Sequence, residues 1–127
     1  DVRRTKQFRY KDNKMDWTKP TTQMLGRFQP WHQGHQELFK RALSKTGQVV
    51  ILLREQDGTT DNPFTTEQRV NFIKEALTTE YDGKFIVIPV PNITHITYGR
   101  GVGYKIEEEF LDKETEAISA TEIRKQM

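Results

Sequence analysis

Three short apolar segments, separated by two stretches with helical periodicity, set the pattern of this sequence. The segments "QVVILL" at 48–53 and "FIVIPV" at 85–90 are continuous apolar runs, which are typical of strands buried on both faces of a parallel sheet. A shorter run, "TQML" at 22–25, leads directly into a turn at Gly26. The pattern predicts a buried strand at each of these three positions.

Two helices are predicted between these strands. After Gly34, apolar side chains recur at helical spacing as far as about Lys45, and Gly47 is a suitable stop signal. The second helix is predicted to begin at Thr65, because Gln68 follows three residues later and completes a capping box. The apolar positions are Leu38, Phe39, Ala42 and Leu43 in the first helix, and Val70, Phe72, Ile73, Ala76 and Leu77 in the second.

Strands and helices therefore alternate in the βαβ pattern of an α/β fold. We expect one Rossmann-like domain at residues 21–127, with a parallel sheet of about four to five strands and helices on both faces. The segment "ITYGRG" at 96–101 is expected as a short fourth strand, and "YKIEEEFL" at 104–111 as an exposed or edge strand. A last helix is expected from Ser119, and the sequence ends inside it, which leaves room for further C-terminal structure.

Composition narrows the class of protein. A chain of 127 residues fits one compact domain. It has no cysteine, which excludes disulfides, cysteine-ligated zinc and thiol nucleophiles and is compatible with a cytoplasmic location. No apolar run approaches the roughly 20 residues of a membrane span, so no membrane role is expected.

The charge is distributed unevenly along the chain. Residues 1–20 carry seven Lys/Arg and three Asp/Glu, whereas the remainder carries thirteen and fifteen. We expect residues 1–20 to be a basic arm or linker, either solvated or packed on a partner such as a second subunit of a homo-oligomer. Because the folded part has no basic excess, nucleic acid is not the expected partner.

The chain places two of its three histidines, His32 and His35, three residues apart just after the predicted first strand. This spacing puts both imidazoles on one face at the start of a helix, where free N–H groups and the helix dipole favour a phosphate. Gly34 leaves no side chain between them, and Gly26 would let a ligand approach the backbone closely. Half of a zinc site is the alternative, but His95 is the only other imidazole and no cysteine is present.

A second candidate anion site lies near the end of the sequence. Ser119 and Glu122 form a capping box at the start of the last predicted helix, with Thr121 and Arg124 beside its exposed N–H groups. An arginine there can hold phosphate oxygens through two parallel hydrogen bonds. The alternative is an ordinary capped helix with a solvated arginine, and the same choice applies to Arg69 in the second predicted helix.

Three segments resemble a known superfamily. The stretch "GRFQPWHQGH", 26–35, is similar to the HxGH signature of the nucleotidyltransferases that include nicotinamide-nucleotide, pantetheine-phosphate and glycerol-phosphate enzymes. The stretch "ISATEIRKQM", 118–127, resembles the second signature of that superfamily. The stretch "NPFTTEQR", 62–69, is similar to the corresponding segment of archaeal-type nicotinamide-nucleotide adenylyltransferases.

The resemblance implies transfer of a nucleoside monophosphate from a nucleoside triphosphate to a phosphate-bearing acceptor, with release of pyrophosphate. His32 and His35 would donate to the α-phosphate and its neighbours, and Arg124 to the β- and γ-phosphates. Mg²⁺ would accompany the nucleotide, with no metal ligand assigned among the signature residues. The nucleotide- and phosphate-binding residues implied or suggested are Gly26, Arg27, Phe28, Gly34, Arg69, Arg100, Ser119 and Thr121.

The opening "GRFQP" is more similar to the adenylyl-transferring members, so ATP is favoured over CTP. The stretch "HITYGRGVG", 95–103, is shorter than the archaeal-type insert that holds nicotinamide, which leaves the acceptor open between nicotinamide mononucleotide and a smaller phosphorylated molecule, such as the alcohol phosphate of a cytidylyltransferase.

Two other residue patterns leave a choice open. The glycines of "YGRGVGY", 98–104, do not match a dinucleotide-binding fingerprint and form either a flexible turn or a loop that contacts the ligand, with Arg100 as a phosphate contact. Trp31 is expected in the core, although it could also stack on a ligand. Rival functions of another class are a non-catalytic nucleotide-binding domain and a nucleic-acid-binding module that uses the basic arm.

Overall fold

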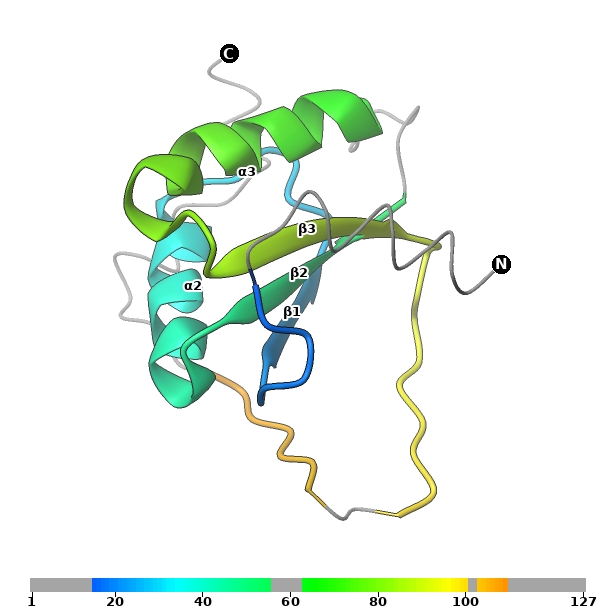
Figure 1. Ribbon diagram of the computed structural model, residues 1–127. Helices are drawn as coiled ribbons and strands as arrows, with labels where there is room; N and C mark the ends of the chain where they lie inside the picture. Colours follow the sequence, from blue (N-terminus) through cyan, green and yellow to red (C-terminus); the bar gives the residue numbers. More distant parts are fainter. Residues whose placement is uncertain (1–14, 56–62, 101–102, 110–127) are drawn as a thin grey trace.

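The computed structural model describes residues 15–55, 63–100 and 103–109, which form an alternating α/β unit (Figure 1). Its elements in chain order are strand β1 (Thr22–Gly26), helix α2 (Gln33–Thr46), strand β2 (Val49–Arg54), helix α3 (Thr66–Tyr81) and strand β3 (Phe85–Val90). The three predicted strands and both predicted helices are confirmed, with bounds that differ by no more than a residue or two from the sequence pattern.

The strands form one parallel sheet in the order β1-β2-β3, with β2 in the centre. The register aligns Met24 of β1 with Ile51 of β2, and Ile51 with Val87 of β3. Because all strands point the same way, the loops that follow β1 and β2 lie at the same edge of the sheet, which is where ligands bind in open α/β folds.

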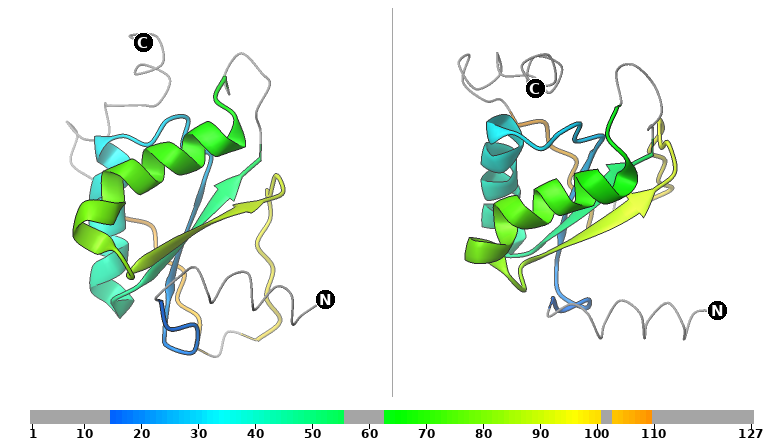
Figure 2. Two further views of the ribbon diagram at one scale, coloured as in Figure 1. Left: turned by 45° about the horizontal axis from the view of Figure 1, so that its top comes forward. Right: turned by 90° about the horizontal axis from the view of Figure 1, so that it is seen from above.

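Both helices cover one face of this sheet (Figures 1 and 2). Along β2, alternate residues are fully buried against the helices, as the two-residue period of a strand requires. The core contains Val49, Ile51 and Leu53 of β2 together with residues of both helices, namely Phe39, Ala42, Ile73 and Leu77. This shared core holds the start of each helix in a fixed position relative to the ends of the strands.

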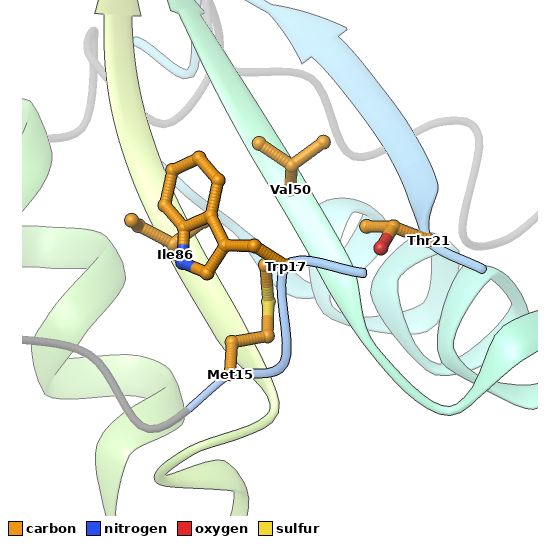
Figure 3. A pocket seen from close by; sticks show the side chains of 5 residues that line it. All are labelled: Met15, Trp17, Thr21, Val50 and Ile86. Carbon is orange, nitrogen blue, oxygen red and sulfur yellow. The ribbon is translucent and has the colours of Figure 1, made fainter. Parts of the chain in front are cut away.

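The opposite face of the sheet carries the half-buried side chains of Val50 and Leu52 from β2 and of Ile86 and Ile88 from β3. Met15 and Trp17 lie on this face and form a small pocket with Thr21, Val50 and Ile86 (Figure 3). The side chain of Gln48 anchors this segment, because its amide nitrogen donates to the carbonyl oxygen of Asp16 at 2.6 Å. Residues 15–20 therefore pack on the domain.

One expectation about the sheet is corrected. In the part of the chain that the structure describes, the sheet has three strands where four to five were expected. Both described helices cover one face, and because the last predicted helix lies outside the described residues, helices on both faces stay a prediction. Neither 96–100 nor 104–109 forms a strand, because the segment after β3 runs away from the carboxyl ends of the strands and packs little (Figures 1 and 2). Its apolar side chains Ile96, Tyr98, Tyr104 and Ile106 are all more than half exposed, at 53% to 68%.

The far end of this segment returns to α2. Lys45, in the last turn of that helix, forms ion pairs with Glu107 at 3.2 Å and Glu109 at 3.0 Å. These ion pairs connect the acidic run to α2 through side chains. The helix predicted from Ser119 lies outside the described residues, as do residues 1–14 of the basic arm.

None of the described helices has the length and apolar character needed to cross a membrane.

Candidate active site

The candidate site is the loop between β1 and α2 and the first turn of α2. In this loop Phe28 adopts a left-handed backbone conformation, with φ of 51°, and the Gln29–Pro30 peptide bond is cis. A bulky residue other than glycine seldom occupies that region, so neighbouring contacts must hold the loop in place. The loop lies at the carboxyl end of β1, beside the start of the helix.

His32 is the N-cap of α2. The sequence pattern placed it at the start of this helix but did not reveal its capping role. Its Nδ1 accepts a hydrogen bond from the backbone N–H of Gly34 at 3.0 Å, and the Nδ1 of His35 accepts one from the backbone N–H of His32 at 3.2 Å. The two histidines thus form a reciprocal capping box, in which imidazoles replace the usual serine and glutamate. The spacing of three residues is the signal that could have indicated it.

The two imidazole rings lie stacked, with centroids 3.8 Å apart and planes inclined by 26°. Burial, with a smaller contribution from the His32 ring, lowers the pKa of His35 to about 3, and burial also lowers the pKa of His32. Both rings are therefore neutral near pH 7. Because each Nδ1 accepts a hydrogen bond from the backbone, each neutral ring carries its proton on Nε2 and can donate from that atom.

Aromatic side chains enclose His35. The Phe28 ring meets it edge-on at 4.9 Å, and the Trp31 ring lies 5.4 Å away. Trp31 is 9% exposed and its indole N–H donates to the side-chain oxygen of Gln36 at 2.8 Å, so the expected core position is confirmed. Phe28, expected as a nucleotide contact, is 4% exposed and forms part of the core. Its ring forms part of the apolar environment of His35.

Gly26 was expected to let a ligand approach the backbone, but in the structure it faces the ring of Phe28. A side-chain carbon placed on Gly26 would lie 3.0 Å from the tip of the Phe28 ring. The missing side chain therefore makes room for that ring, which packs over the end of β1.

Arg69, expected as a phosphate contact, is fully buried. Its guanidinium donates to the carbonyl oxygens of Arg27, Arg54 and Thr65 and to the side-chain oxygens of Glu55 and Thr66. All five N–H donors are thus directed at protein acceptors. In this structure Arg69 serves as an internal brace instead of a ligand contact.

A second contact joins the same two regions. The Gln29 side chain accepts a hydrogen bond from the backbone N–H of Phe64 at 3.0 Å and donates to the carbonyl oxygen of Phe64 at 3.2 Å. Gln29 is 1% exposed. Residues 63–69 of the segment "NPFTTEQR" therefore support the β1–α2 loop, which gives a physical reason for both segments to occur together.

The remaining predicted residues fall into three groups. Arg27 lies in the β1–α2 loop, and Gly34 lies in the first turn of α2, where its N–H donates to His32. Arg100 is exposed on segment 91–100, which runs away from the sheet after the carboxyl end of β3 (Figure 1). Ser119, Thr121 and Arg124 lie outside the described residues.

A metal cage is absent from residues 15–55, 63–100 and 103–109, where no three His, Cys, Asp or Glu side chains gather.

A parallel α/β unit with a capped helix start after its first strand is the setting of a nucleotide-binding enzyme domain. The chain belongs to the cytidylyltransferase-like family, whose characteristic sequence pattern matches residues 24–97 and so includes the β1–α2 loop and α3.

Several similar proteins carry the name nicotinamide-nucleotide adenylyltransferase. The protein of Thermoplasma volcanium is 33% identical over 72 residues, which cover 55% of this chain and 40% of the relative. That of Ignicoccus hospitalis is 39% identical over 74 residues, covering 54% and 42%. That of Pyrococcus horikoshii is 29% identical over 131 aligned positions, covering 81% and 70%. The chain thus spans less than half the length of the first two relatives.

Proposed function

We propose that the chain transfers a nucleoside monophosphate, AMP in preference to CMP, from a nucleoside triphosphate to a phosphate-bearing acceptor with release of pyrophosphate. The observation that carries this proposal is the stacked pair His32 and His35 at the start of α2. Two neutral imidazoles with Nε2–H groups at a helix N-terminus are suited to hold a phosphate whose negative charge increases as it is attacked.

The chemistry requires little from the protein beyond alignment and stabilisation of charge. The acceptor phosphate oxygen attacks the α-phosphorus, the new P–O bond forms, and the bond to the β-phosphate oxygen breaks to release pyrophosphate. Both reactants are anions, so holding them in line in a preformed site is the main task. Neutral donors suit this task, and burial favours the neutral form of both rings because it lowers the pKa of each.

Adenylyl transfer is favoured over cytidylyl transfer because the similar proteins are named nicotinamide-nucleotide adenylyltransferase. For the same reason nicotinamide mononucleotide is the first acceptor to test. The exposed segment 91–100 supplies no enclosed pocket wall at the end of β3, which keeps a smaller phosphorylated acceptor as the second candidate.

The β- and γ-phosphates are assigned to Arg124 with Ser119 and Thr121, on the sequence resemblance alone. Mg²⁺ is proposed to arrive bound to the triphosphate, since phosphate oxygens are ligands that it accepts without a protein cage. A cytoplasmic location and assembly into a homo-oligomer are further proposals that rest on the sequence.

The deciding experiment is an assay of pyrophosphate release in the presence of Mg²⁺. ATP and CTP are each combined with nicotinamide mononucleotide, glycerol 3-phosphate or phosphopantetheine, and each nucleotide alone is the control. Release that needs both ATP and one acceptor supports the proposal and identifies the acceptor. Nucleotide binding without release from any pair would favour a non-catalytic nucleotide-binding domain, and salt-dependent binding of RNA or DNA would favour the nucleic-acid module.

A further inference from the structure

Arg69 connects three parts of the chain that meet at the carboxyl edge of the sheet. Its Nη1 donates to the carbonyl oxygen of Arg27 at 3.0 Å and to that of Arg54 at 2.8 Å, at the ends of β1 and β2. Its Nη2 donates to Glu55 at 3.2 Å, and its Nε to the carbonyl oxygen of Thr65, the N-cap of α3, at 3.4 Å. One rigid, planar group therefore fixes the relative positions of both strand ends and of the helix start.

Stability alone is a weak reason for this arrangement. A fully buried guanidinium loses its hydration, and its position in the first turn of α3 places a cation at the positive end of the helix dipole. What an arginine offers that an apolar side chain does not is five donors in a fixed geometry, directed to separate acceptors. The arrangement therefore indicates a requirement for positioning.

The group that most needs positioning is the β1–α2 loop. The carbonyl oxygen of Arg27 belongs to the peptide group that precedes Phe28, whose φ of 51° is unfavourable for a residue with a side chain. Such a conformation persists when its surroundings fix it from several sides. Arg69 holds this peptide, and two residues later Gln29 is held by its paired hydrogen bonds to the Phe64 backbone.

We propose that Arg69 is a positioning residue, which together with Gln29 holds the β1–α2 loop, and through it His32 and His35, in the conformation that binds the nucleotide. The effect on nucleotide binding rests on the proposed function, whereas the effect on the loop does not. The start of α3 thereby acts as the rigid support of the β1–α2 loop.

The test compares Arg69→Lys with Leu77→Ala. Lysine keeps the positive charge but cannot reach the separate acceptors with one ammonium group. Leu77 is fully buried on the same helix, about two turns from Arg69, so Leu77→Ala supplies a loss of stability without a change at the loop. Two readouts are used: the backbone amide NMR resonances of Phe28 and Gly34, and the dissociation constant for ATP measured by calorimetry.

We expect Arg69→Lys to shift or broaden the Phe28 and Gly34 resonances and to weaken ATP binding by about tenfold or more, which corresponds to about one hydrogen-bonded contact misplaced. We expect Leu77→Ala to lower the melting temperature while both readouts keep their wild-type values. Wild-type resonances and affinity in a folded Arg69→Lys variant would overturn the proposal, as would equal changes in Leu77→Ala.

A second variant applies if Arg69→Lys does not fold. Gln29→Met keeps the buried volume but removes both hydrogen bonds to Phe64, and it should change the same two readouts in the same direction. Unchanged loop resonances in Gln29→Met would overturn the proposal. If the wild-type protein binds neither ATP nor CTP, the proposed function fails, while the resonances of Phe28 and Gly34 still decide whether Arg69 and Gln29 position the loop.

Discussion

The ring of Phe28 stands edge-on to the imidazole of His35, with centroids 4.9 Å apart and planes at 86°. Phe28 is 4% exposed, so the most buried imidazole of the site rests on a side chain that itself belongs to the core. The environment that keeps His35 neutral is therefore continuous with the environment that stabilises the fold, and changes to one should be measurable in the other.

Removal of the Phe28 ring should change both properties together. Phe28→Ala is expected to lower the free energy of unfolding by about 3 kcal/mol, through lost burial and the cavity left behind. Because burial is the main cause of the low pKa of His35, that pKa should rise towards its ordinary value of 6.5. Urea denaturation and an NMR titration of the His35 ring measure the two effects.

Phe72→Ala is the matched control for this variant. Phe72 is a half-buried aromatic residue on α3 whose ring meets Phe64 edge-on at 5.3 Å. The rings that meet His35 are those of Phe28, Trp31 and His32. It should reduce stability without altering the titration of His35. An unchanged His35 pKa in folded Phe28→Ala would show that the ring does not create the apolar environment of the histidine.

The low pKa of His35 also predicts how stability depends on pH. The folded state holds His35 neutral down to a pKa of about 3, whereas the unfolded chain takes up a proton near 6.5. The unfolded state therefore binds more protons between these values, so stability is fully present above pH 6.5 and falls as the pH decreases towards 3. From His35 alone we expect about 2 kcal/mol less stability at pH 5 than at pH 8.

Unfolding free energies from urea titrations at pH 8 and pH 5 measure this difference. In His35→Asn the amide does not titrate, so the difference should shrink by the amount assigned to His35. If the wild-type protein and His35→Asn lose the same stability over this range, the assignment to His35 is wrong.

The capping geometry allows the donor role of His32 to be separated from its structural role. Asparagine is a good N-cap, and in His32→Asn its side-chain oxygen can accept from the Gly34 N–H in place of Nδ1. The variant lacks the Nε2–H group, so the melting temperature should stay near that of the wild type while kcat for the proposed transfer falls by about 10²- to 10³-fold.

His95→Asn is the control, because His95 is exposed on the segment after β3 and should tolerate the change without loss of activity. Comparable turnover in His32→Asn and the wild type would exclude His32 as a donor to the reacting phosphate.

Gly26 offers a test of close packing at the end of β1. The added methyl group of Gly26→Ala would lie 3.0 Å from the Phe28 ring, which is enclosed on its other sides by Trp31 and His35. We expect a loss of about 1–3 kcal/mol in unfolding free energy, because the ring cannot move without disturbing the site. Denaturation in urea measures it, and weaker ATP binding should accompany it.

Gly99→Ala is the corresponding control, since no atom lies within 4 Å of the position that its new methyl group would take. Equal stabilities of the two variants would mean that the Phe28 ring can move aside freely.

Local sequence patterns predicted the scaffold closely. The strand Phe85–Val90 has the bounds of its apolar run. Helices pack on one of its faces, and Met15 and Trp17 lie against Ile86 on the other, so apolar residues occur on both faces. The helix cap at Thr65 was predicted from Gln68, because both partners lie within one turn of the chain. Such features depend on residues that are neighbours in the sequence, so the sequence alone determines them.

The contacts that shape the site depend on residues far apart in the sequence. Arg69 and the carbonyl group of Arg27 are separated by 42 positions, and Gln29 and Phe64 by 35. A single arginine in the first turn of a helix looks the same in the sequence whether it meets a ligand or turns inwards. Only the arrangement of the two strand ends around α3 shows that it turns inwards.

The use of Nδ1 by the helix cap has a consequence for the chemistry of the pair. A ring can relay a proton only if one nitrogen releases it while the other takes one up, and in both histidines the second nitrogen is engaged with the backbone. Neither ring is therefore arranged to pass a proton from one of its nitrogens to the other. For the proposed transfer, the rate in heavy water should be close to the rate in ordinary water.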